Sequence, residues 1–378
     1  MKILHVAPSI SRAYGGPTYS LAAFASAALE QGAELTIAAP RPPEADTWLA
    51  GALPQAEVHE FRTLGGGAFL ASPALHDWIR ANGSRFDVVH VHGLLNPVSS
   101  LATRACVRKG WPVVVRPFGT MSRYTYEHRR GALKQLYRAL LDKPNLIRVS
   151  AMHFTTTVER DESAWQNIAW GARAHVIPPP WLEHSSPAHA GAPADSRMVL
   201  FFSRLHPVKR LELLLEAWTD IQLRAPGATL VIAGSGEVDY VRELRARAAP
   251  LGPQVTFAGF VEGAQKNELF GDAAVLVLPS LHENFGIAVL EALAAGLPVV
   301  VTPQVQLSAF VREHALGIIA ESSASALASA VVAVLDDTIL RQRCHTQGAA
   351  LVNRYFSPRA IGERLFDMYR FANAHPPA

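Results

Sequence analysis

The sequence predicts an α/β protein with two domains, each built on a parallel sheet that helices cover on both faces. Apolar stretches of roughly four to six residues alternate with amphipathic helical segments along both halves of the chain. This alternation is typical of buried parallel strands joined by helices. The chain has 378 residues, of which 49% are hydrophobic and 18% charged, so it is long enough to form two cores.

The first half contains a regular series of expected strands separated by helices. The strands are expected at 2–7, 34–39, 58–62, 87–91, 112–116, 151–155 and 174–177. The helices are expected at 18–31, 73–81, 97–109, 131–141 and 160–171. Each helix is long enough to carry the chain from one parallel strand to the next.

A proline-rich segment separates the two halves. Residues 178–193 combine five prolines with serine and alanine, which is typical of a linker. We therefore expect a first domain at 1–180, a linker at 181–196 and a second domain at 197–357. The second domain opens with an expected strand at 199–202 and an expected helix at 211–224.

The turn between that strand and that helix is basic. Arg204 and Lys209 lie within this turn, residues 203–210, and the helical segment follows it directly. Two cations beside exposed backbone N–H groups suit a diphosphate, because arginine gives a forked contact and lysine a point charge. The alternative is solvated surface charge, which describes most Arg and Lys residues.

Two glutamates eight positions apart follow a second buried strand, expected at 274–278. The segment reads as a short loop and then an apolar helix that Asn284 opens and Gly296 closes. Glu283 would lie at the N-terminal end of the helix, and Glu291 about two turns further along it. A loop that joins a strand end to a helix is a common ligand site, and carboxylates there suit ligand hydroxyls. A surface glutamate and an unrelated helix glutamate remain the alternative.

Together these residues resemble glycosyltransferase family 4, the retaining nucleotide-sugar transferases of the GT-B fold. The resemblance also rests on Gly15-Gly16, on the turn 233–236 and on Phe260-Val261, and it runs from Met1 to about Arg370. It implies two Rossmann-like domains whose parallel sheets face each other across a cleft. It also implies that a C-terminal helix, 358–373, crosses back onto the first, acceptor-side domain, while the second domain binds the donor.

The resemblance implies transfer of a sugar from a nucleotide diphosphate-sugar to a glycan or lipid-linked acceptor, in polysaccharide or glycolipid biosynthesis, with retention of anomeric configuration. It assigns catalytic roles to His92, Arg204, Lys209 and Glu283, and donor contacts to Gly15, Gly16, Gly234, Val261, Asn284, Phe285, Gly286 and Glu291. His92 would face the cleft beside the donor sugar. Glu283 would hold sugar hydroxyls, and Glu291 would hold the ribose.

Several absent motifs narrow the chemistry. The sequence has no Gly-x-Gly-x-x-Gly after either first strand, no Gly-Lys pair, no Asp-x-Asp and no His-Glu-x-x-His. His90 and His92 point the same way on a strand and could share an ion, but no third ligand is apparent. We therefore expect no catalytic metal, no cofactor beyond the nucleotide-sugar co-substrate, and a structural role for His90.

The segment 116–148 is basic and contains aromatic residues. It holds eight Lys or Arg against Glu127 and Asp142. Such a stretch suits an anionic membrane surface or a phosphate-bearing lipid acceptor, with a solvated helix face as the alternative. We assign the acceptor side to Arg116, Phe118 and Arg123. A net charge of +3 and the lack of a recognition motif argue against nucleic acid.

The remaining sequence features concern location and competing functions. Cys106 and Cys344 form no disulfide framework, and no signal-peptide or membrane-spanning run is present, so we expect a cytoplasmic protein that is at most peripheral at the inner membrane face. Two other functions stay open. A sugar-nucleotide epimerase of similar architecture would act without an acceptor, and a non-catalytic nucleotide-sugar-binding protein would transfer nothing.

Overall fold

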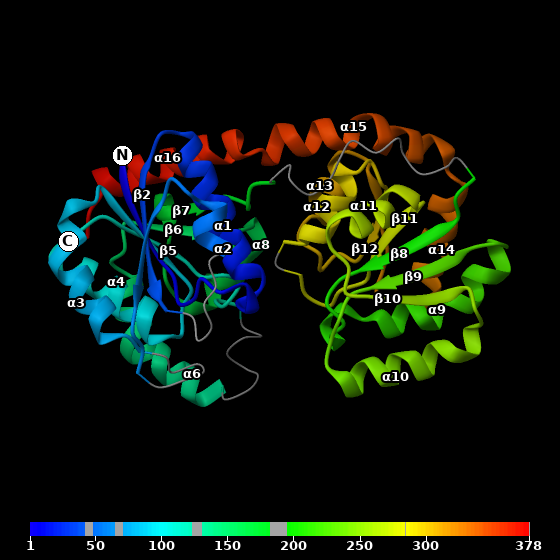
Figure 1. The fold of residues 1–378 in the computed structure, drawn as a ribbon, viewed down its shortest axis with the longest axis horizontal. Coiled ribbons are helices and arrows are strands. Elements are labelled where there is room, and N and C mark those ends of the chain that lie inside the picture. The colour runs from blue at the N-terminus through cyan, green and yellow to red at the C-terminus, as the bar shows by residue number, and fades with distance from the viewer. Residues whose placement is uncertain (42–47, 65–70, 123–130, 182–194, 284, 378) are drawn as a thin grey trace. The chain divides into compact units, whose positions relative to one another are not determined.

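The computed structural model describes residues 1–41, 48–64, 71–122, 131–181, 195–283 and 285–377 (Figure 1). The chain forms two compact units, Met1–Trp181 with Phe356–Ala378, and Leu182–Tyr355. Each unit contains one parallel sheet, of seven strands in the first and six in the second. The predicted pair of Rossmann-like domains is therefore confirmed.

The strand order of the sheet in the first unit reverses at its centre. Its strands are β1 (Lys2–Val6), β2 (Glu34–Pro40), β3 (Glu57–Phe61), β4 (Val88–His92), β5 (Val113–Arg116), β6 (Ala151–Phe154) and β7 (Ala174–Val176). Their order is β3-β2-β1-β4-β5-β6-β7. Successive strands are added on one side of β1 and then on the other, starting with β4. In open α/β sheets ligands bind at the carboxyl ends of the strands beside such a reversal.

Helices cover both faces of this sheet. The helices are α1 (Gly16–Glu30), α2 (Trp48–Ala52), α3 (Pro73–Asn82), α4 (Pro97–Lys109), α6 (Gly131–Tyr137), α7 (Lys143–Leu146), α8 (Thr157–Glu162) and α16 (Pro358–Ala374). Helices α1 and α16 share one core with Ile3 and Val88, whereas α3 and α4 share the other with Leu4 and Val89. Successive strand residues thus point to opposite faces, as the period of a strand requires.

The second unit repeats the same plan. Its strands are β8 (Met198–Phe202), β9 (Thr229–Ala233), β10 (Val255–Gly259), β11 (Val275–Leu278), β12 (Val299–Val301) and β13 (Gly317–Ile319), in the order β10-β9-β8-β11-β12-β13. The helices are α9 (Leu211–Arg224), α10 (Val238–Ala248), α11 (Gly263–Asp272), α12 (Ile287–Ala294), α13 (Ser308–Glu313), α14 (Ala324–Asp336) and α15 (Thr338–Phe356). The order reverses between β8 and β11, so the loops after these strands flank the expected ligand position.

Two expected helices differ from the structure. Helix α12 begins at Ile287, directly after Gly286, whose φ of 93° is left-handed, so Glu291 lies about one turn inside the helix and not two. The helix expected at 160–171 is instead α8, which starts earlier because the Thr156 side chain accepts a hydrogen bond from the Glu159 N–H. Asn167, at φ 54°, ends the 3-10 turn that follows it. Within the described ranges, no helix has both the length and the apolar character that crossing a membrane requires.

Candidate functional site

The basic turn after β8 is held in a defined backbone conformation. His206 begins a 3-10 helix, Pro207–Lys209, and its Nδ1 accepts a hydrogen bond of 3.2 Å from the Val208 N–H. Arg210 then adopts a left-handed φ of 52° before α9 begins. The Lys209 side chain is 14% exposed, whereas Arg204 is exposed. Of the two cations predicted to bind a diphosphate, Lys209 is therefore enclosed and Arg204 is solvated.

Lys209 forms an ion pair with Glu283, from Nζ to Oε2. Glu283 follows β11, and its backbone is fixed by bonds from its N–H to the Gln304 carbonyl and from the Gln306 N–H to its own carbonyl, both 3.2 Å. The Leu281 N–H also donates to the Val208 carbonyl at 2.8 Å. The structure thus joins the two loops that flank the strand-order reversal, and it brings one predicted cation to one predicted carboxylate.

Glu291 has a different partner, which the sequence analysis missed. Lys266 on α11 places its Nζ 3.0 Å from Glu291 Oε1, and the side chains are 14% and 13% exposed. Burial raises the pKa of the Glu291 carboxyl, and Lys266 opposes that shift. No pattern marked Lys266, because a single lysine on a helix is usually a solvated surface residue. Each glutamate of the motif is therefore paired with its own lysine.

The glycine turn after β9 packs against the basic turn. A Cβ at Gly234 would overlap the Ser203 carbonyl oxygen, and one at Gly236 would overlap the Leu205 carbonyl oxygen. The Leu205 N–H donates to the Ser235 carbonyl at 2.8 Å. Only glycine allows backbones this close, so these residues fix where the basic turn lies.

The remaining donor-side residues have mixed environments. Val261 and Phe285 are buried, at 4% and 6% exposure. Gly286 has the left-handed φ that precedes α12. Gly15, at φ 77°, is the residue before α1, and no atom lies within 4 Å of a Cβ built on Gly15 or Gly16. Asn284 lies outside the described residues.

His92 ends β4 and is fully buried in a cluster of histidines. Its ring lies 4.2 Å from the His90 ring and 4.9 Å from the His5 ring, between centroids. The third histidine that the sequence analysis did not find is His5, which is paired opposite His90 across β1 and β4. One ring nitrogen from each of the three lies within 4.8 Å of the others.

The charge around these histidines does not favour a cation. Burial lowers the pKa of His92 well below its usual range, and His5 and Arg116 lower it further. The pKa of His5 falls to about 3 for the same two physical reasons, burial and Arg116. Neutral imidazoles can bind a metal ion, but the neighbouring guanidinium would repel one.

Arg116 and Phe118 form a packed unit at the end of β5. Arg116 is 2% exposed, and its guanidinium lies between the rings of Phe24 and Phe118, at 4.3 and 4.2 Å from their centroids. Its Nη2 donates to Ser20 Oγ at 2.9 Å. Of the three residues predicted on the acceptor side, Arg116 is thus buried, Phe118 is partly exposed and Arg123 lies outside the described residues.

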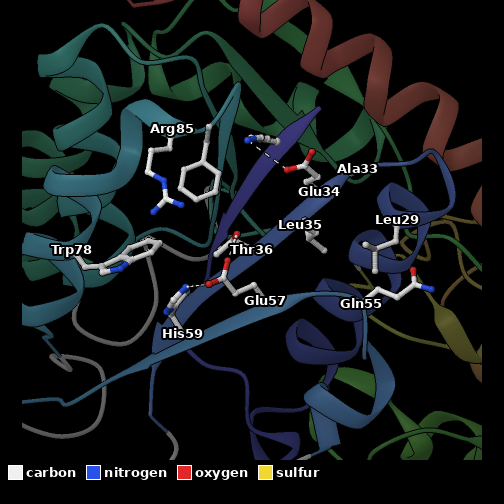
Figure 2. Close-up of a pocket in the computed structure, with 12 residues that line it drawn as sticks. Leu29, Ala33, Glu34, Leu35, Thr36, Gln55, Glu57, His59, Trp78 and Arg85 are labelled. Atoms are coloured by element: carbon white, nitrogen blue, oxygen red, sulfur yellow. Dashed lines mark hydrogen bonds and ion pairs between the residues drawn. The ribbon is translucent and has the colours of Figure 1, made fainter.

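A separate cavity of about 410 Å³ opens at the amino ends of the strands of this sheet (Figure 2). Its lining includes Lys2, Glu34 and Glu57, which are the first residues of β1, β2 and β3. Figure 2 shows the ion pair of 2.9 Å between His59 Nε2 and Glu57 Oε1 beside Trp78. Because ligands of α/β sheets bind at the carboxyl ends of strands, this cavity is not the candidate site.

Comparisons with known proteins agree with this architecture. A family model described as "Glycosyl transferase 4-like domain" matches residues 15–180, and one described as "Glycosyl transferases group 1" matches residues 185–350. The phosphatidyl-myo-inositol mannosyltransferase of Mycobacterium leprae is 31% identical over 294 residues, covering 75% of this chain and 74% of the relative. The enzyme of that name from Mycobacterium tuberculosis is 30% identical over 333 residues, covering 81% and 83%.

Solved structures share the fold across nearly the whole chain. Anabaena HepE in complex with UDP has a TM-score of 0.75 at 18% identity, covering 98% of this chain and 100% of that one. Sucrose-phosphate synthase from Thermosynechococcus elongatus has a TM-score of 0.72 at 18% identity, covering 99% and 100%. Two Rossmann-like domains of this kind define the GT-B fold. The chain is therefore a glycosyltransferase of the GT4 type.

Proposed function

We propose that this glycosyltransferase moves a sugar from a nucleotide diphosphate-sugar to a glycan or lipid-linked acceptor with retention of anomeric configuration. The observation that carries the proposal is the Lys209–Glu283 pair, which joins the loops after β8 and β11. A cation and a carboxylate at one strand-order reversal match a ligand with a phosphate part and a hydroxyl-rich part. Complexes of HepE with UDP and with UDP-glucose support a donor of this class.

The cations act on the leaving group. Breaking the bond between the anomeric carbon and the phosphate oxygen leaves positive character on the sugar and negative charge on the diphosphate. Lys209 and Arg204 stabilise that charge, with the N–H groups of Phe285 and Gly286 as further donors. A preorganised electrostatic donor of this type typically contributes about 10²–10³ in rate. We therefore propose that no metal or other cofactor takes part.

The carboxylates hold the polar ends of the donor. Glu283, positioned by Lys209, accepts hydrogen bonds from sugar hydroxyls. Lys266 bonds one carboxylate oxygen of Glu291, and the remaining acceptor capacity of a carboxylate is enough for the ribose hydroxyls. The acceptor hydroxyl attacks the anomeric carbon from the face that the diphosphate leaves, so the configuration is retained. A β-phosphate oxygen takes the proton of that hydroxyl.

A lipid-linked acceptor is supported by the surface of the segment 131–148. Leu133, Leu136 and Leu140 are 45%, 56% and 67% exposed. Lys134 and Lys143 of the same segment are partly exposed, so the segment presents both apolar and basic side chains to solvent. Such a surface suits an anionic membrane, and we propose peripheral attachment at its cytoplasmic face.

The proposal is tested by incubating the protein with UDP-, GDP- and ADP-sugars in turn. A true donor should raise the melting temperature, because it binds the native state alone. NMR of the product formed with a lipid or glycan acceptor should then show the anomeric configuration of the donor. Inversion would contradict the retaining mechanism. Conversion of the donor sugar without an acceptor would indicate an epimerase. An unchanged melting temperature with every nucleotide sugar would argue against both sugar transfer and epimerisation.

A further inference from the structure

The buried histidines of the first unit lie on one face of its sheet. His5 on β1, His90 and His92 on β4, and His153 on β6 are all fully buried. Ile3, Val88 and Ala151, which lie two positions before His5, His90 and His153, belong to the core that α1 and α16 cover. Because strand residues alternate between faces, the four imidazoles also point toward these two helices.

Tyr369 of α16 links these histidines. Its hydroxyl lies 2.9 Å from His90 Nδ1 and 3.3 Å from His5 Nε2. His92 Nε2 lies 3.3 Å from His5 Nδ1, and His153 Nδ1 lies 3.3 Å from His90 Nε2. His153 Nε2 is 2.7 Å from the carbonyl oxygen of Ile177. Five hydrogen bonds thus form one continuous chain from Ile177 to His92.

The donor and the acceptor of each of these hydrogen bonds follow from the bond to the Ile177 carbonyl oxygen. A carbonyl oxygen can only accept, so His153 must carry its proton on Nε2 and accept at Nδ1. His90 must then donate from Nε2 and accept the Tyr369 hydroxyl at Nδ1. That hydroxyl has one proton, so its oxygen accepts from His5 Nε2. His5 Nδ1 accepts in turn from His92 Nε2.

One atom at the far end is left as an acceptor. His92 Nδ1 is buried and has no hydrogen-bond partner among the described residues, and the same is true of Arg116 Nε and Nη1. His92 and Arg116 are paired opposite each other across β4 and β5. The residues that carry this acceptor and these donors are therefore neighbours at the carboxyl ends of two strands, and an acceptor with an N–H donor is a set that one hydroxyl group can satisfy.

The ring of Phe118 covers this pair. It lies 5.8 Å from the His92 ring, between centroids, and 4.2 Å from the Arg116 guanidinium carbon. Phe118 is partly exposed and has a left-handed φ of 55°, which is unusual for an aromatic residue. It is thus a partly exposed group that contacts both residues.

We propose that His5, His90, His153 and Tyr369 are positioning residues that hold His92 with its proton on Nε2. His92 Nδ1 and the Arg116 guanidinium then receive a substrate hydroxyl together, Nδ1 accepting and the guanidinium donating. The inference rests on the proposed function, and on the position beside the donor sugar that the resemblance to family 4 implies for His92. A neutral cluster is consistent with the burial and the nearby Arg116 that lower the pKa of His90 and His153.

The hydrogen-bond order is tested in the wild-type protein without any ligand. Nitrogen NMR of protein labelled with ¹⁵N-histidine should show four histidines that carry the proton on Nε2 between pH 5 and pH 8. The purified protein should carry no stoichiometric metal. A proton on Nδ1 of His92, or one tightly bound zinc per chain, would overturn the proposal. These measurements need no donor, so they stay informative even if the proposed transfer reaction is wrong.

The positioning role is tested with Tyr369→Phe, which keeps the ring and removes the linking hydroxyl. His92 should then show a mixture of both proton positions. With the donor identified by the thermal-shift screen, kcat should fall about 10- to 100-fold, the range typical of losing a partner that orients a functional side chain, while KM for the donor changes little. Tyr240→Phe, which removes a hydroxyl bonded to Glu212 in the second unit, is the matched control. Equal kcat in Tyr369→Phe and wild type would contradict the role.

Discussion

Lys209 and Glu283 are 74 positions apart in the sequence, yet their side chains form an ion pair with both groups largely enclosed. Their loops follow β8 and β11, which are neighbours in the sheet. A substrate phosphate would give Lys209 a second anionic partner, and sugar hydroxyls would give Glu283 donors. The pair therefore positions both groups before a donor arrives, which is how preorganised electrostatic sites gain their effect.

Lys209→Ala should separate phosphate recognition from nucleoside recognition. We expect affinity for the nucleoside diphosphate to fall at least about 10-fold, because a charged hydrogen bond contributes roughly 1.5–3 kcal/mol, whereas affinity for the bare nucleoside stays the same. Calorimetry with both ligands measures this. Arg242→Ala is the control, because Arg242 is 74% exposed and forms an ion pair with its helix neighbour Asp239. Equal losses for diphosphate and nucleoside would rule out a phosphate role.

Glu291→Gln should change how stability depends on pH. Burial raises the folded-state pKa of Glu291 above its unfolded value of 4.5, so the folded state binds this proton more tightly. The contribution of this proton to the free energy of unfolding is complete below pH 4.5 and is lost as the pH rises through the pKa of Glu291 in the folded state. The unfolding free energy of Glu291→Gln minus that of wild type should therefore increase with pH above 4.5. Urea unfolding at several pH values measures it, and a decrease would show that the Lys266 attraction dominates instead.

Gly362→Ala should loosen the contact between α16 and α1. A Cβ at Gly362 would lie 2.6 Å from the Ala27 carbonyl oxygen, so the helices must separate. We expect a loss of about 1–3 kcal/mol in the free energy of unfolding. Gly51→Ala provides the contrast: no atom lies within 4 Å of its Cβ, and it lies within α2, so it should be neutral or stabilising. Similar thermal unfolding of both variants would refute close packing at Gly362.

Leu136→Ser combined with Leu140→Ser should weaken membrane binding. Both side chains are more than half exposed, and burying a leucine in an apolar phase contributes roughly 1.5–3 kcal/mol when complete. Co-sedimentation with vesicles rich in anionic lipid should show at least about a 5-fold weaker association. Leu223→Ser changes an exposed leucine of α9 in the second unit and should have no effect. Identical sedimentation of all three proteins would remove the support for a membrane-bound acceptor.

The sequence predicted the strands and most helices well, because buried parallel strands are short and apolar throughout. Helix α9 was placed at its observed bounds, and β4 was expected to end beside His92. The position of Glu291 within α12 was misjudged by about one turn, because the helix begins only after the left-handed Gly286. A backbone conformation of that kind is decided by the packing of the loop.

The side-chain partners were harder to predict than the elements. The neighbours of His92 had a signal, since His5, His90 and His153 each lie near the end of a strand, and parallel strand ends meet at one edge. Tyr369 had none, because it reaches this cluster from a helix 279 positions beyond His90. Lys266 likewise comes from a helix whose packing no local pattern shows.

The central claim is that a pyrophosphate ester binds at the basic turn after β8. A crystal structure of the protein with an intact nucleotide diphosphate-sugar tests this most directly. The account predicts phosphate oxygens within hydrogen-bonding distance of Lys209 Nζ and the Arg204 guanidinium, with a sugar hydroxyl on Glu283. A nucleotide bound elsewhere, with the Lys209–Glu283 pair untouched, would contradict it.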